Sequence, residues 1–485
     1  MDQSINYGEG QVVSNAGRDV VINNYMGAVS DRESLAFHFV RDDGLKVLDT
    51  ALGTLWDAIA GVEASHKAER QVQRGTCLPG TRQEPLRMIH VWRTMKEQPC
   101  PICWLTGAAG VGKSAIAMTV AESCEKAGVL VSSFFFQADP KRNNPSSLML
   151  SIAHGLASTM LPLRNSIKRI ISMDPTIFQA SLEVQFRELI LAPTCSVDHA
   201  GSQLVQNIIV IDSLDECGDE DTQLRILSII RSAFQQAPHF PLRFLICSRS
   251  ESWIREAFST TPLRQLTEVI VLDHSFMPDR DIRQYYVHHF REISGSPKYS
   301  QVQFPSPWPS HEELGTLVWM SSGQFVYAST TVKFVRLAYS HPVTQFRTIL
   351  DNTSAHPPTK SPYHELDNLY NMVLGVNPDH DRVLPILASI LVFGESRYLS
   401  PSPTSIELLL GLPSGQVALT LRAMYSVLDV RGGWDDIRIY HSSFREYLID
   451  PTRSRGFHVD VGVQKYLLAR RWLQNLSVNK IPTYR

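Results

Sequence analysis

Residues 104–117 read Trp-Leu-Thr-Gly-Ala-Ala-Gly-Val-Gly-Lys-Ser-Ala-Ile-Ala, which predicts a short apolar strand, a glycine-rich turn and the start of a helix. The spacing Gly107-x4-Gly112-Lys113-Ser114 matches the phosphate-binding P-loop at every fixed position. The glycines let successive backbone N–H groups point at a phosphate, and the helix N-terminus adds its positive dipole end. A chance glycine-rich turn is the alternative, but strand, loop and helix follow one another here in the required order.

The P-loop pattern gives each of its side chains an expected role. We expect Lys113 to reach the β- and γ-phosphates of a nucleotide, and the Ser114 hydroxyl to ligate Mg²⁺. The expected nucleotide-binding residues of this loop are Gly107, Ala108, Ala109, Gly110, Val111, Gly112, Lys113, Ser114 and Ala115.

Length and composition indicate a globular protein with several domains. The 485 residues exceed one compact core, so about two to four domains are expected. Hydrophobic residues make up 43% and charged residues 19%, as in soluble proteins. The net charge of -2 gives no electrostatic reason to expect nucleic acid or an acidic membrane as a partner. No apolar run approaches about 18 residues, so no transmembrane helix is expected.

The cysteines and the N-terminus favour a cytoplasmic location. The first residues lack the basic and apolar regions of a secretory signal, and seven cysteines in so long a chain favour reduced thiols. Cys100 and Cys103 have CxxC spacing. A structural role is favoured over a metal or redox role, because Cys103 opens the P-loop strand and no second ligand pair accompanies it.

Two segments of different character precede the P-loop region. Residues 1–30 are rich in Asn, Gly and β-branched residues, and Val20–Tyr25 has high strand propensity without proline or charge. This segment is interpreted either as a flexible leader or as one that templates β-stacking between chains. Residues 31–75 predict a helical linker that packs on the next domain. Its apolar residues at helical spacing are Leu45, Leu48, Leu52, Leu55, Trp56 and Ile59.

Residues 206–212, Gln-Asn-Ile-Ile-Val-Ile-Asp, have the Walker B pattern of an apolar strand that ends in an acid. In a parallel sheet the carboxylate emerges beside the P-loop. Asp212 is expected to hold Mg²⁺ through water, so Ser114 and Asp212 form the expected metal site. Asp215 or Glu216 is expected to orient or deprotonate the attacking water. The alternative is a strand capped by a solvated acidic loop.

Three further strands complete the predicted sheet, and the last of them covers residues 269–273. Residues 242–249 end in Arg249, which is placed either to sense a γ-phosphate or to lie on the surface. Residues 129–136 form a strand between the Walker A and Walker B strands in sequence. By analogy, that order suggests the P-loop class with an additional central strand and a catalytic acid near Walker B. The prediction for residues 76–275 is therefore an α/β nucleotide-binding domain with a parallel sheet.

The rest of the chain is predominantly helical. Residues 276–362 predict a helical domain. Residues 363–450 combine helices, a helix-turn-helix pattern and a hairpin around two glycines, which predicts a winged-helix domain. DNA binding by it is disfavoured, because residues 417–428 carry a single basic residue. His441 closes the predicted wing, either as a packed or solvated histidine or as a contact to nucleotide. Residues 451–485 predict a helical tail.

Several motifs together resemble the NACHT NTPases of mushroom-forming fungi. They are Cys77-Leu-Pro-Gly-Thr-Arg82, Trp104-Leu-Thr-Gly-Ala-Ala-Gly-Val-Gly-Lys-Ser114-Ala-Ile, Val210-Ile-Asp-Ser-Leu-Asp-Glu-Cys217, Ile246-Cys-Ser-Arg-Ser250 and Ile439-Tyr-His-Ser-Ser-Phe-Arg-Glu-Tyr-Leu448. The resemblance extends over residues 76–450 and connects the chain with the NOD-like receptors of animals and the resistance proteins of plants, which are STAND P-loop NTPases. The spacing of Asp215-Glu216 from Asp212 favours NACHT over other P-loop ATPases.

The resemblance implies a signalling switch of the kind used in innate immunity. In such proteins, ADP held between the nucleotide-binding, helical and winged-helix domains keeps the chain closed. Exchange for ATP drives ring- or wheel-like self-association, which brings N-terminal effector segments together. By this resemblance Arg249 is the sensor arginine, His441 touches the ADP phosphate, and the ligands are ATP or ADP with Mg²⁺. Slow hydrolysis and a downstream effector partner are implied as well.

Two features depart from the family pattern. Residues 323–325, Gly-Gln-Phe, lack the proline of a Gly-x-Pro turn over adenine, so a preference for ATP over GTP is not implied by that turn. Only residues 451–485 follow the winged-helix region, without a repeat period, so a version without the usual repeat sensor is expected.

Two other classes of function stay open at this point. A P-loop ATPase that remodels a substrate would show fast turnover without a change of oligomer. A winged-helix DNA-binding regulator would show salt-dependent duplex binding.

Overall fold

The computed structural model describes residues 50–72, 75–95, 100–137, 142–196, 207–237, 239–337, 340–352, 363–377, 379–396 and 398–478. These residues lie within one unit of the chain, which begins at Leu48. The predictions for residues 1–30, and for Leu45 and Leu48 of the linker helix, fall outside the described residues.

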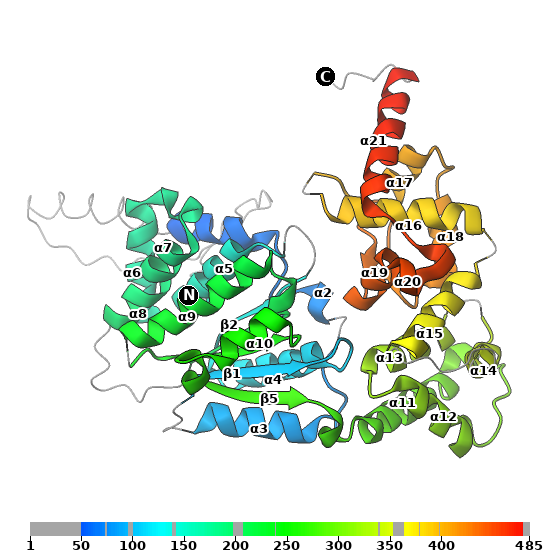
Figure 1. Ribbon diagram of the computed structural model, residues 1–485, viewed down its shortest axis with the longest axis horizontal. Helices are drawn as coiled ribbons and strands as arrows, with labels where there is room; N and C mark the ends of the chain where they lie inside the picture. The colour runs from blue at the N-terminus through cyan, green and yellow to red at the C-terminus, as the bar shows by residue number, and fades with distance from the viewer. Residues whose placement is uncertain are drawn as a thin grey trace, which may run out of the picture. The chain divides into compact units, whose positions relative to one another are not determined.

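A five-stranded parallel sheet forms the centre of the N-terminal half, in the order β2-β3-β4-β1-β5 (Figure 1). The strands are β1 (Ile102–Gly107), β2 (Leu130–Phe135), β3 (Asn207–Asp212), β4 (Leu242–Ser248) and β5 (Thr267–Leu272). The predicted α/β fold with a parallel sheet is confirmed. The strand that lies between the two Walker strands in space is β4, whereas β2, which lies between them in sequence, is an edge strand.

The parallel register brings the ends of the strands to one edge of the sheet. Thr106 of β1 is opposite Ser248 of β4, and Phe135 of β2 is opposite Asp212 of β3. The carboxyl ends of parallel strands are where α/β proteins bind ligands. The loops after β1, β3 and β4 therefore begin side by side.

Alternating strand residues face two separate cores, as a period of two requires. Cys103 and Leu105 of β1 belong to the core with α3 and α4, whereas Ile102 and Trp104 face the core on the opposite side, under α5. The helices of this half are α3 (Gln83–Thr94), α4 (Lys113–Lys126), α5 (Pro145–Thr159), α6 (Leu161–Met173), α7 (Leu182–Phe186), α8 (Ala192–Ser196), α9 (Glu220–Gln236) and α10 (Ser252–Ser259).

The linker ahead of the sheet packs onto it. A helix over residues 50–60 places Leu55 in the core under α5, as its apolar spacing predicts, together with Ala51. Trp56, which was expected on the same face, is 53% exposed. The chain then runs along the edge strand β2, where the backbone N–H of Phe135 donates to the carbonyl of Ala64. His66 is buried there and its Nδ1 lies 2.7 Å from Ser133 Oγ. The short helix α2 (Glu69–Val72) follows.

The C-terminal half is helical and shares one core. The helices after β5 are α11 (Pro278–Ser294), α12 (His311–Ser321), α13 (Phe325–Val335), α14 (Pro342–Asn352), α15 (His364–Gly375), α16 (His380–Gly394), α17 (Pro403–Leu410), α18 (Gln416–Leu421), α19 (Ser442–Ile449), α20 (Pro451–Ser454) and α21 (Val461–Val478). Their buried side chains, from Ile282 to Leu468, form a single cluster.

The predicted helix-turn-helix and hairpin are shorter than expected. The second helix, expected over residues 417–428, ends at Leu421 and continues as a 3₁₀ turn at Arg422–Met424. The hairpin strands β6 (Leu428–Asp429) and β7 (Arg438–Ile439) have two residues each. The turn between them is held by a bond from the Gly432 N–H to the Asp435 carboxylate, which fixes a long tip instead of extending the ladder.

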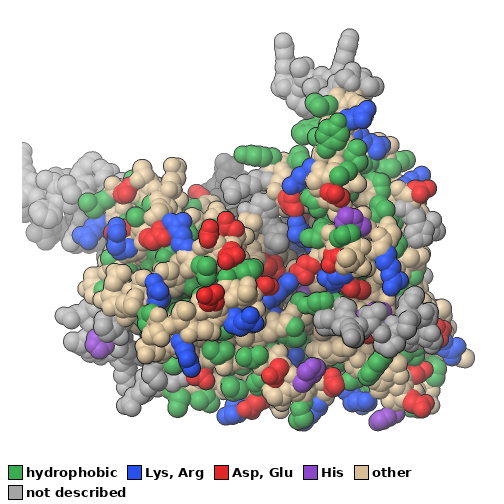
Figure 2. Space-filling view, viewed as in Figure 1, with side chains coloured by type: hydrophobic (Ala, Val, Ile, Leu, Met, Phe, Trp, Pro, Cys, Tyr) green, Lys and Arg blue, Asp and Glu red, His purple; other side chains and the backbone are tan. Residues whose placement is uncertain are grey.

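The surface carries charges of both signs. On the face shown in Figure 2, Lys and Arg side chains are intermixed with Asp and Glu, and neither sign dominates a broad area. Hydrophobic side chains gather beside α21 at the upper right of that view. Of the helices in the described ranges, none combines the length and the apolar character that crossing a bilayer requires.

A tight contact between α5 and β2 gives a stability test. A Cβ on Gly155 would lie 2.2 Å from the carbonyl oxygen of Val131. We expect Gly155→Ala to lower the free energy of unfolding by about 1–3 kcal/mol, because the helix must move away from the strand. Gly53 lies in the helix over residues 50–60 with open space around its Cβ position, so Gly53→Ala should stabilise by about 0.5–1 kcal/mol. Urea denaturation measures both, and an unchanged Gly155→Ala protein would contradict the contact.

Candidate nucleotide-binding site

The P-loop has the predicted strand–loop–helix form. β1 ends at Gly107 and α4 begins at Lys113. Gly110 and Gly112 have φ angles of 77° and 97°, in the left-handed region that glycine adopts without a steric penalty. Gly112 is also the N-cap of α4, so the positive end of that helix faces the loop.

The helical half contacts the P-loop directly. The backbone N–H of Val326, in the first turn of α13, donates to the carbonyl of Gly110 at 3.1 Å. A Cβ on Gly110 would lie 2.3 Å from Val326 Cγ1, so this close approach requires glycine.

Lys113 lies across the loop. Its Nζ donates to the carbonyls of Gly107 and Ala108, at 2.7 and 2.8 Å. Burial lowers the pKa of Lys113, while the carboxylates of Asp215 and Asp212 act in the opposite direction without restoring it to its usual value. The half-buried ammonium group therefore lies beside the Walker B acids.

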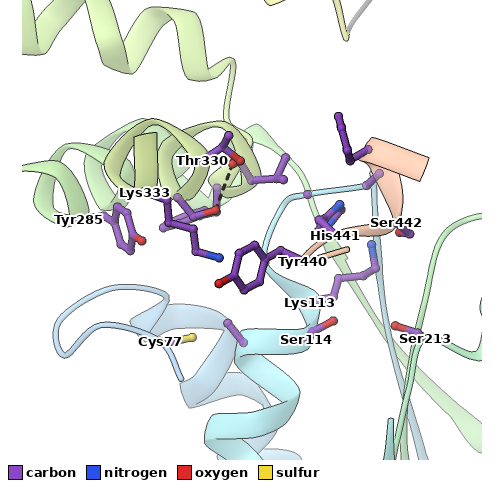
Figure 3. Close-up of a pocket in the computed structure, with 18 of the residues that line it drawn as sticks. Cys77, Lys113, Ser114, Ser213, Tyr285, Thr330, Lys333, Tyr440, His441 and Ser442 are labelled. Atoms are coloured by element: carbon purple, nitrogen blue, oxygen red, sulfur yellow. Dashed lines mark hydrogen bonds between the residues drawn. The ribbon is translucent and has the colours of Figure 1, made fainter. Parts of the chain in front are cut away.

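A cavity of about 300 Å³ opens above the loop, at the lower end of the range for small-molecule sites (Figure 3). The predicted site residues that line it are Ala109, Gly110, Gly112, Lys113, Ser114, Ala115, Asp215, Glu216, Arg249 and His441. The predicted residues outside its lining are Gly107, Ala108, Val111 and Asp212. Gly107, Ala108 and Val111 instead present their carbonyls to Lys113 and to Arg82.

Asp212 ends β3 and is almost fully buried. Its Oδ2 accepts a hydrogen bond from the Ser213 hydroxyl at 3.0 Å. Its charge acts on Lys113, which places it close to the P-loop. Together with the Ser114 hydroxyl in the cavity wall, it offers the oxygen donors that Mg²⁺ prefers.

Arg249 follows β4 and connects two distant parts of the chain. Its backbone N–H and its Nε contact the two oxygens of Asp215, at 2.9 and 3.3 Å. Its Nη2 donates to Ser442 Oγ at 3.0 Å and forms an ion pair with Glu446, both in α19. Burial lowers the pKa of Arg249, but Glu446 and Asp215 outweigh it, so the pKa lies above its usual value.

His441 is the N-cap of α19 and lines the same cavity as Lys113. Its Nδ1 accepts the backbone N–H of Ser443 at 3.1 Å and lies 2.7 Å from the hydroxyl of that residue. Because Nδ1 is bonded to Ser443, a contact of His441 with nucleotide would have to use Nε2. That contact stays a prediction.

Arg82 is a site residue to which the sequence assigned no role. Its Nη2 donates to the carbonyl of Val111 at 2.5 Å, and its guanidinium lies 4.7 Å from the ring centroid of Phe325. Its backbone N–H donates to Asp281 of α11. The six-residue motif ending at Arg82 is visible in the sequence, but Asp281 is 199 residues away, so no local pattern reveals the pair.

The end of the cavity away from the phosphate loop is also formed by unpredicted residues. Figure 3 shows Ser213 at one end and Cys77, Tyr285 and Lys333 at the other. The Lys333 ammonium lies 3.1 Å from the centroid of the Tyr440 ring. This cation–π contact joins α13 to the segment just before His441.

Cys100 and Cys103 form no metal cluster among the described residues. Cys103 is buried in β1 and both thiols are free. The described residues close enough together to hold an ion are His288, His289 and Glu292 of α11, and there Arg336 is ion-paired with Glu292.

Comparison with known proteins supports a P-loop NTPase domain. Residues 80–249, less than half of the chain, match the family described as "Nephrocystin 3, N-terminal". This range contains the P-loop, the Walker B strand and Arg249. A comparison with curated proteins gives no match.

Solved structures give distant likenesses. The Walker-type ATPase paby2304 of Pyrococcus abyssi is 15% identical, with 75% of this chain and 94% of that chain covered and a TM-score of 0.33. Cdc6p from Pyrobaculum aerophilum is 13% identical, with 81% and 95% covered and a TM-score of 0.34. The ADP form of the ORC2 protein of Aeropyrum pernix is 10% identical, with 81% and 93% covered and a TM-score of 0.30. The sheet order and the loop geometry, and not these likenesses, identify the fold.

Removing Arg82 tests how the P-loop is held. Arg82→Ala leaves the Val111 carbonyl without its side-chain donor and removes the positive charge near Asp281, while the backbone bond to Asp281 stays, so we expect the free energy of unfolding to fall by about 1–3 kcal/mol. Arg87→Ala, on the exposed face of α3, removes a surface contact with Glu84 and should change stability little. Chemical denaturation compares the two, and equal effects would show that Arg82 does not hold the loop.

Proposed function

We propose that this chain is a nucleotide-controlled signalling switch of the NACHT group of STAND P-loop NTPases. The observation that carries the proposal is the ion pair between Arg249, which lines the P-loop cavity, and Glu446 of α19, which lies outside the cavity lining. It connects the end of a sheet strand with a helix almost 200 residues later in the chain. A residue placed to sense a γ-phosphate is thus engaged by the segment that covers the site.

The pair gives a physical reason for distinguishing ADP from ATP. Arg249 is bonded to Glu446, Ser442 and Asp215, so its guanidinium is already satisfied in this arrangement. A γ-phosphate in the cavity would compete for the same guanidinium and repel the Glu446 carboxylate. ADP lacks that phosphate. The proposed resting state therefore holds ADP, and ATP favours release of α19.

The proposed chemistry is slow hydrolysis. Ser114 and Asp212 would hold Mg²⁺, which would neutralise charge on the phosphates, and Lys113 would bind the β- and γ-phosphates. Asp215 and Glu216 both line the cavity, so either would be placed to orient the attacking water. Arg249 and Asp215 bind each other in this arrangement, so the Arg249 guanidinium is already engaged. This is consistent with the slow hydrolysis of a switch and not with a fast enzyme.

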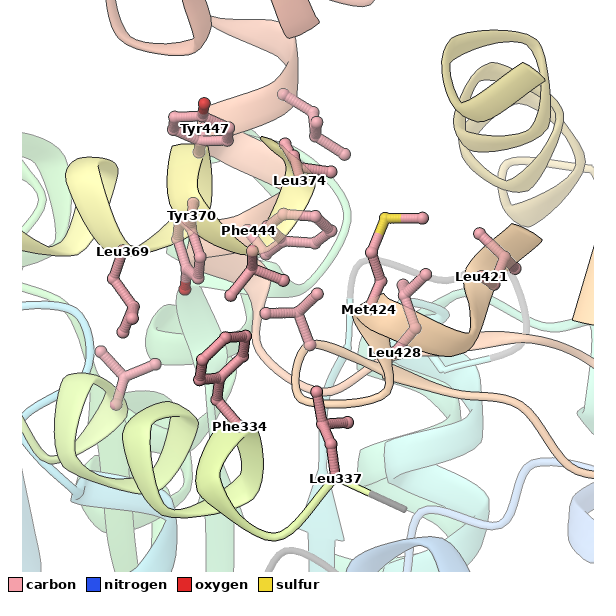
Figure 4. Close-up of a cluster of buried hydrophobic side chains, with 14 of the residues drawn as sticks. Phe334, Leu337, Leu369, Tyr370, Leu374, Leu421, Met424, Leu428, Phe444 and Tyr447 are labelled. Carbon is pink, nitrogen blue, oxygen red and sulfur yellow. The ribbon is translucent and has the colours of Figure 1, made fainter. Parts of the chain in front are cut away.

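The covering segment is suited to move as one body. Phe334 of α13, Tyr370 of α15 and Phe444 of α19 belong to the same buried cluster (Figure 4). The Tyr370 and Phe444 rings lie 5.0 Å apart. In the proposed organisation, residues 76–275 bind nucleotide, 276–362 form the helical domain and 363–450 the winged-helix domain. A shared core couples the last two.

Base recognition would occur between α13 and the segment before α3. Where related receptors have a Gly-x-Pro turn, this chain has Gly323-Gln-Phe325, and Phe325 stacks on Arg82. Thr76 and Lys333 also line this part of the cavity. We propose adenine nucleotides as ligands, with GTP as the alternative that a binding comparison separates.

The proposed output is self-association in the cytoplasm, which gathers the N-terminal segments of residues 1–30 as effectors. Nucleic acid is not a proposed partner, because the net charge is -2 and the charges in Figure 2 are intermixed. Nanomolar, salt-dependent duplex binding would favour the regulator alternative instead.

The first test concerns the nucleotide. We expect ADP to co-purify with the chain, and Lys113→Ala to weaken ADP and ATP binding at least about tenfold, because it removes the phosphate-binding cation. Lys126→Ala, at the exposed end of the same helix, is the matched control and should bind normally. Calorimetry measures both. Normal nucleotide binding by Lys113→Ala would refute the site.

The second test concerns the switch. Glu446→Gln should release ADP at least about fivefold faster and assemble at lower ATP concentration, because Arg249 loses its charged partner in α19 and keeps only the ion pair with Asp215. Glu183→Gln breaks an exposed ion pair with Arg225 and should leave both properties unchanged. Fluorescent-ADP release and light scattering report the two properties. Many turnovers per second without a change of mass would favour the substrate-remodelling ATPase.

A further inference from the structure

Two exposed aromatic side chains stand on neighbouring loops of the C-terminal half. Tyr398 is 95% and Trp434 75% exposed. The loops are bonded to each other: the Thr404 N–H donates to the Gly433 carbonyl at 2.9 Å, and the Ile437 N–H to the Pro401 carbonyl at 3.0 Å. Large aromatic groups on braced loops lose little conformational freedom on binding and are frequent anchors of interfaces.

This aromatic face is acidic. Asp435 and Asp436 follow Trp434 directly, and their carboxylates hold the hairpin tip through Gly432 and Ser400. Among the described residues of the hairpin tip, the basic side chain Arg431 is already paired with Asp429 and Glu69. The face therefore presents an aromatic pair beside negative charge.

α21 carries a second exposed face with the opposite charge. Val463, Tyr466, Leu467 and Leu473 are 45–68% exposed. With Arg470 they recur at helical spacing on the side opposite the buried Leu468. These four hydrophobic residues and Arg470 are called the α21 stripe.

The charge of α21 is uniformly positive. Residues 461–478 contain Lys465, Arg470 and Arg471 and no acidic residue. Lys465 is paired with Glu395, and Arg471 donates to the carbonyl of Leu410, so both lie toward the body of the protein. Arg470 is exposed within the stripe.

We propose that the aromatic face of one copy of this chain, Tyr398 and Trp434 with Asp435 and Asp436, docks on the α21 stripe of a second copy. Each face supplies apolar surface, and the charges are complementary only when unlike faces meet. Two aromatic faces would bring acid against acid, and two stripes base against base, which is unfavourable. The inference deepens the self-association of the proposed function by naming its surfaces.

Site-specific crosslinking between two full-length chains tests the contact. In a Cys195→Ser background, which removes an exposed native thiol, a tagged Trp434→Cys chain is mixed with an untagged Leu473→Cys chain and a short bismaleimide, in ADP and in ATP. We expect a mixed-chain product in at least one nucleotide state that exceeds the products of either chain alone. No mixed product, or product only between like chains, would overturn the proposal.

A loss-of-contact variant gives an independent readout. Trp434→Ser should weaken self-association at least about tenfold in sedimentation, with nucleotide affinity unchanged. Trp319→Ser, which removes an exposed tryptophan from α12, is the matched control and should associate like the wild type. Equal association of all three chains would overturn the proposal.

The outcomes of these experiments distinguish failure of the proposed interface from failure of the proposed switch. If the crosslink forms but assembly does not respond to ATP, the proposed interface is supported and the switch is refuted. If ATP drives assembly but no crosslink forms, the switch is supported and the proposed interface is refuted. A third outcome is that the wild-type chain floats with phosphatidylserine vesicles, the Leu473→Ser chain does not, and no crosslink forms. This outcome would assign the α21 stripe to a lipid surface and overturn the proposal.

Discussion

All strands of the sheet run in the same direction, and this constraint brings the loops after β1, β3 and β4 to one edge. The phosphate loop, the acids that follow β3 and Arg249 are neighbours for that reason alone. None of these loops is long enough to close the site. The remaining walls come from α13 and from the segment that leads into α19. The second half of the chain thus contacts the first half at the binding cavity, and further contacts such as Gln284 to Pro79 and Arg431 to Glu69 lie outside it.

Three cations gather at the cavity, of which Arg82 is buried and Lys113 and Arg249 are half-buried. Lys113, Arg82 and Arg249 are held by loop carbonyls and by carboxylates of the chain itself. A buried charge is stabilising only while its partners stay in place. A nucleotide would supply additional negative charge to the same groups, so binding and folding of this region should be coupled.

Much of the sheet and the phosphate loop could be predicted from sequence, because both depend on local spacing. The apolar runs that end in Asp212 and Ser248 identify strands, and the glycine spacing identifies the loop. An additional central strand was expected by analogy, but the sequence did not identify β4 as that strand, because strand order depends on crossovers that leave no local pattern. Glu446 and Arg82 were missed for a related reason: each acts on a partner more than 190 residues distant. The hairpin strands are shorter than predicted. The β propensity of their residues gives no sign of the hydrogen bond between the Gly432 N–H and the Asp435 carboxylate, which holds the tip.

The contact between residues 64–66 and β2 has a consequence for solubility. An edge strand offers a row of backbone groups to any other extended chain, and proteins commonly cover such edges. Here the Ala64 carbonyl and the buried His66 occupy part of the edge of β2. The stretch that enters the sheet from the N-terminal side thus also protects it from pairing with foreign strands. Stacking of extended segments, wherever the chain uses it, would then occur away from this edge and leave the sheet intact.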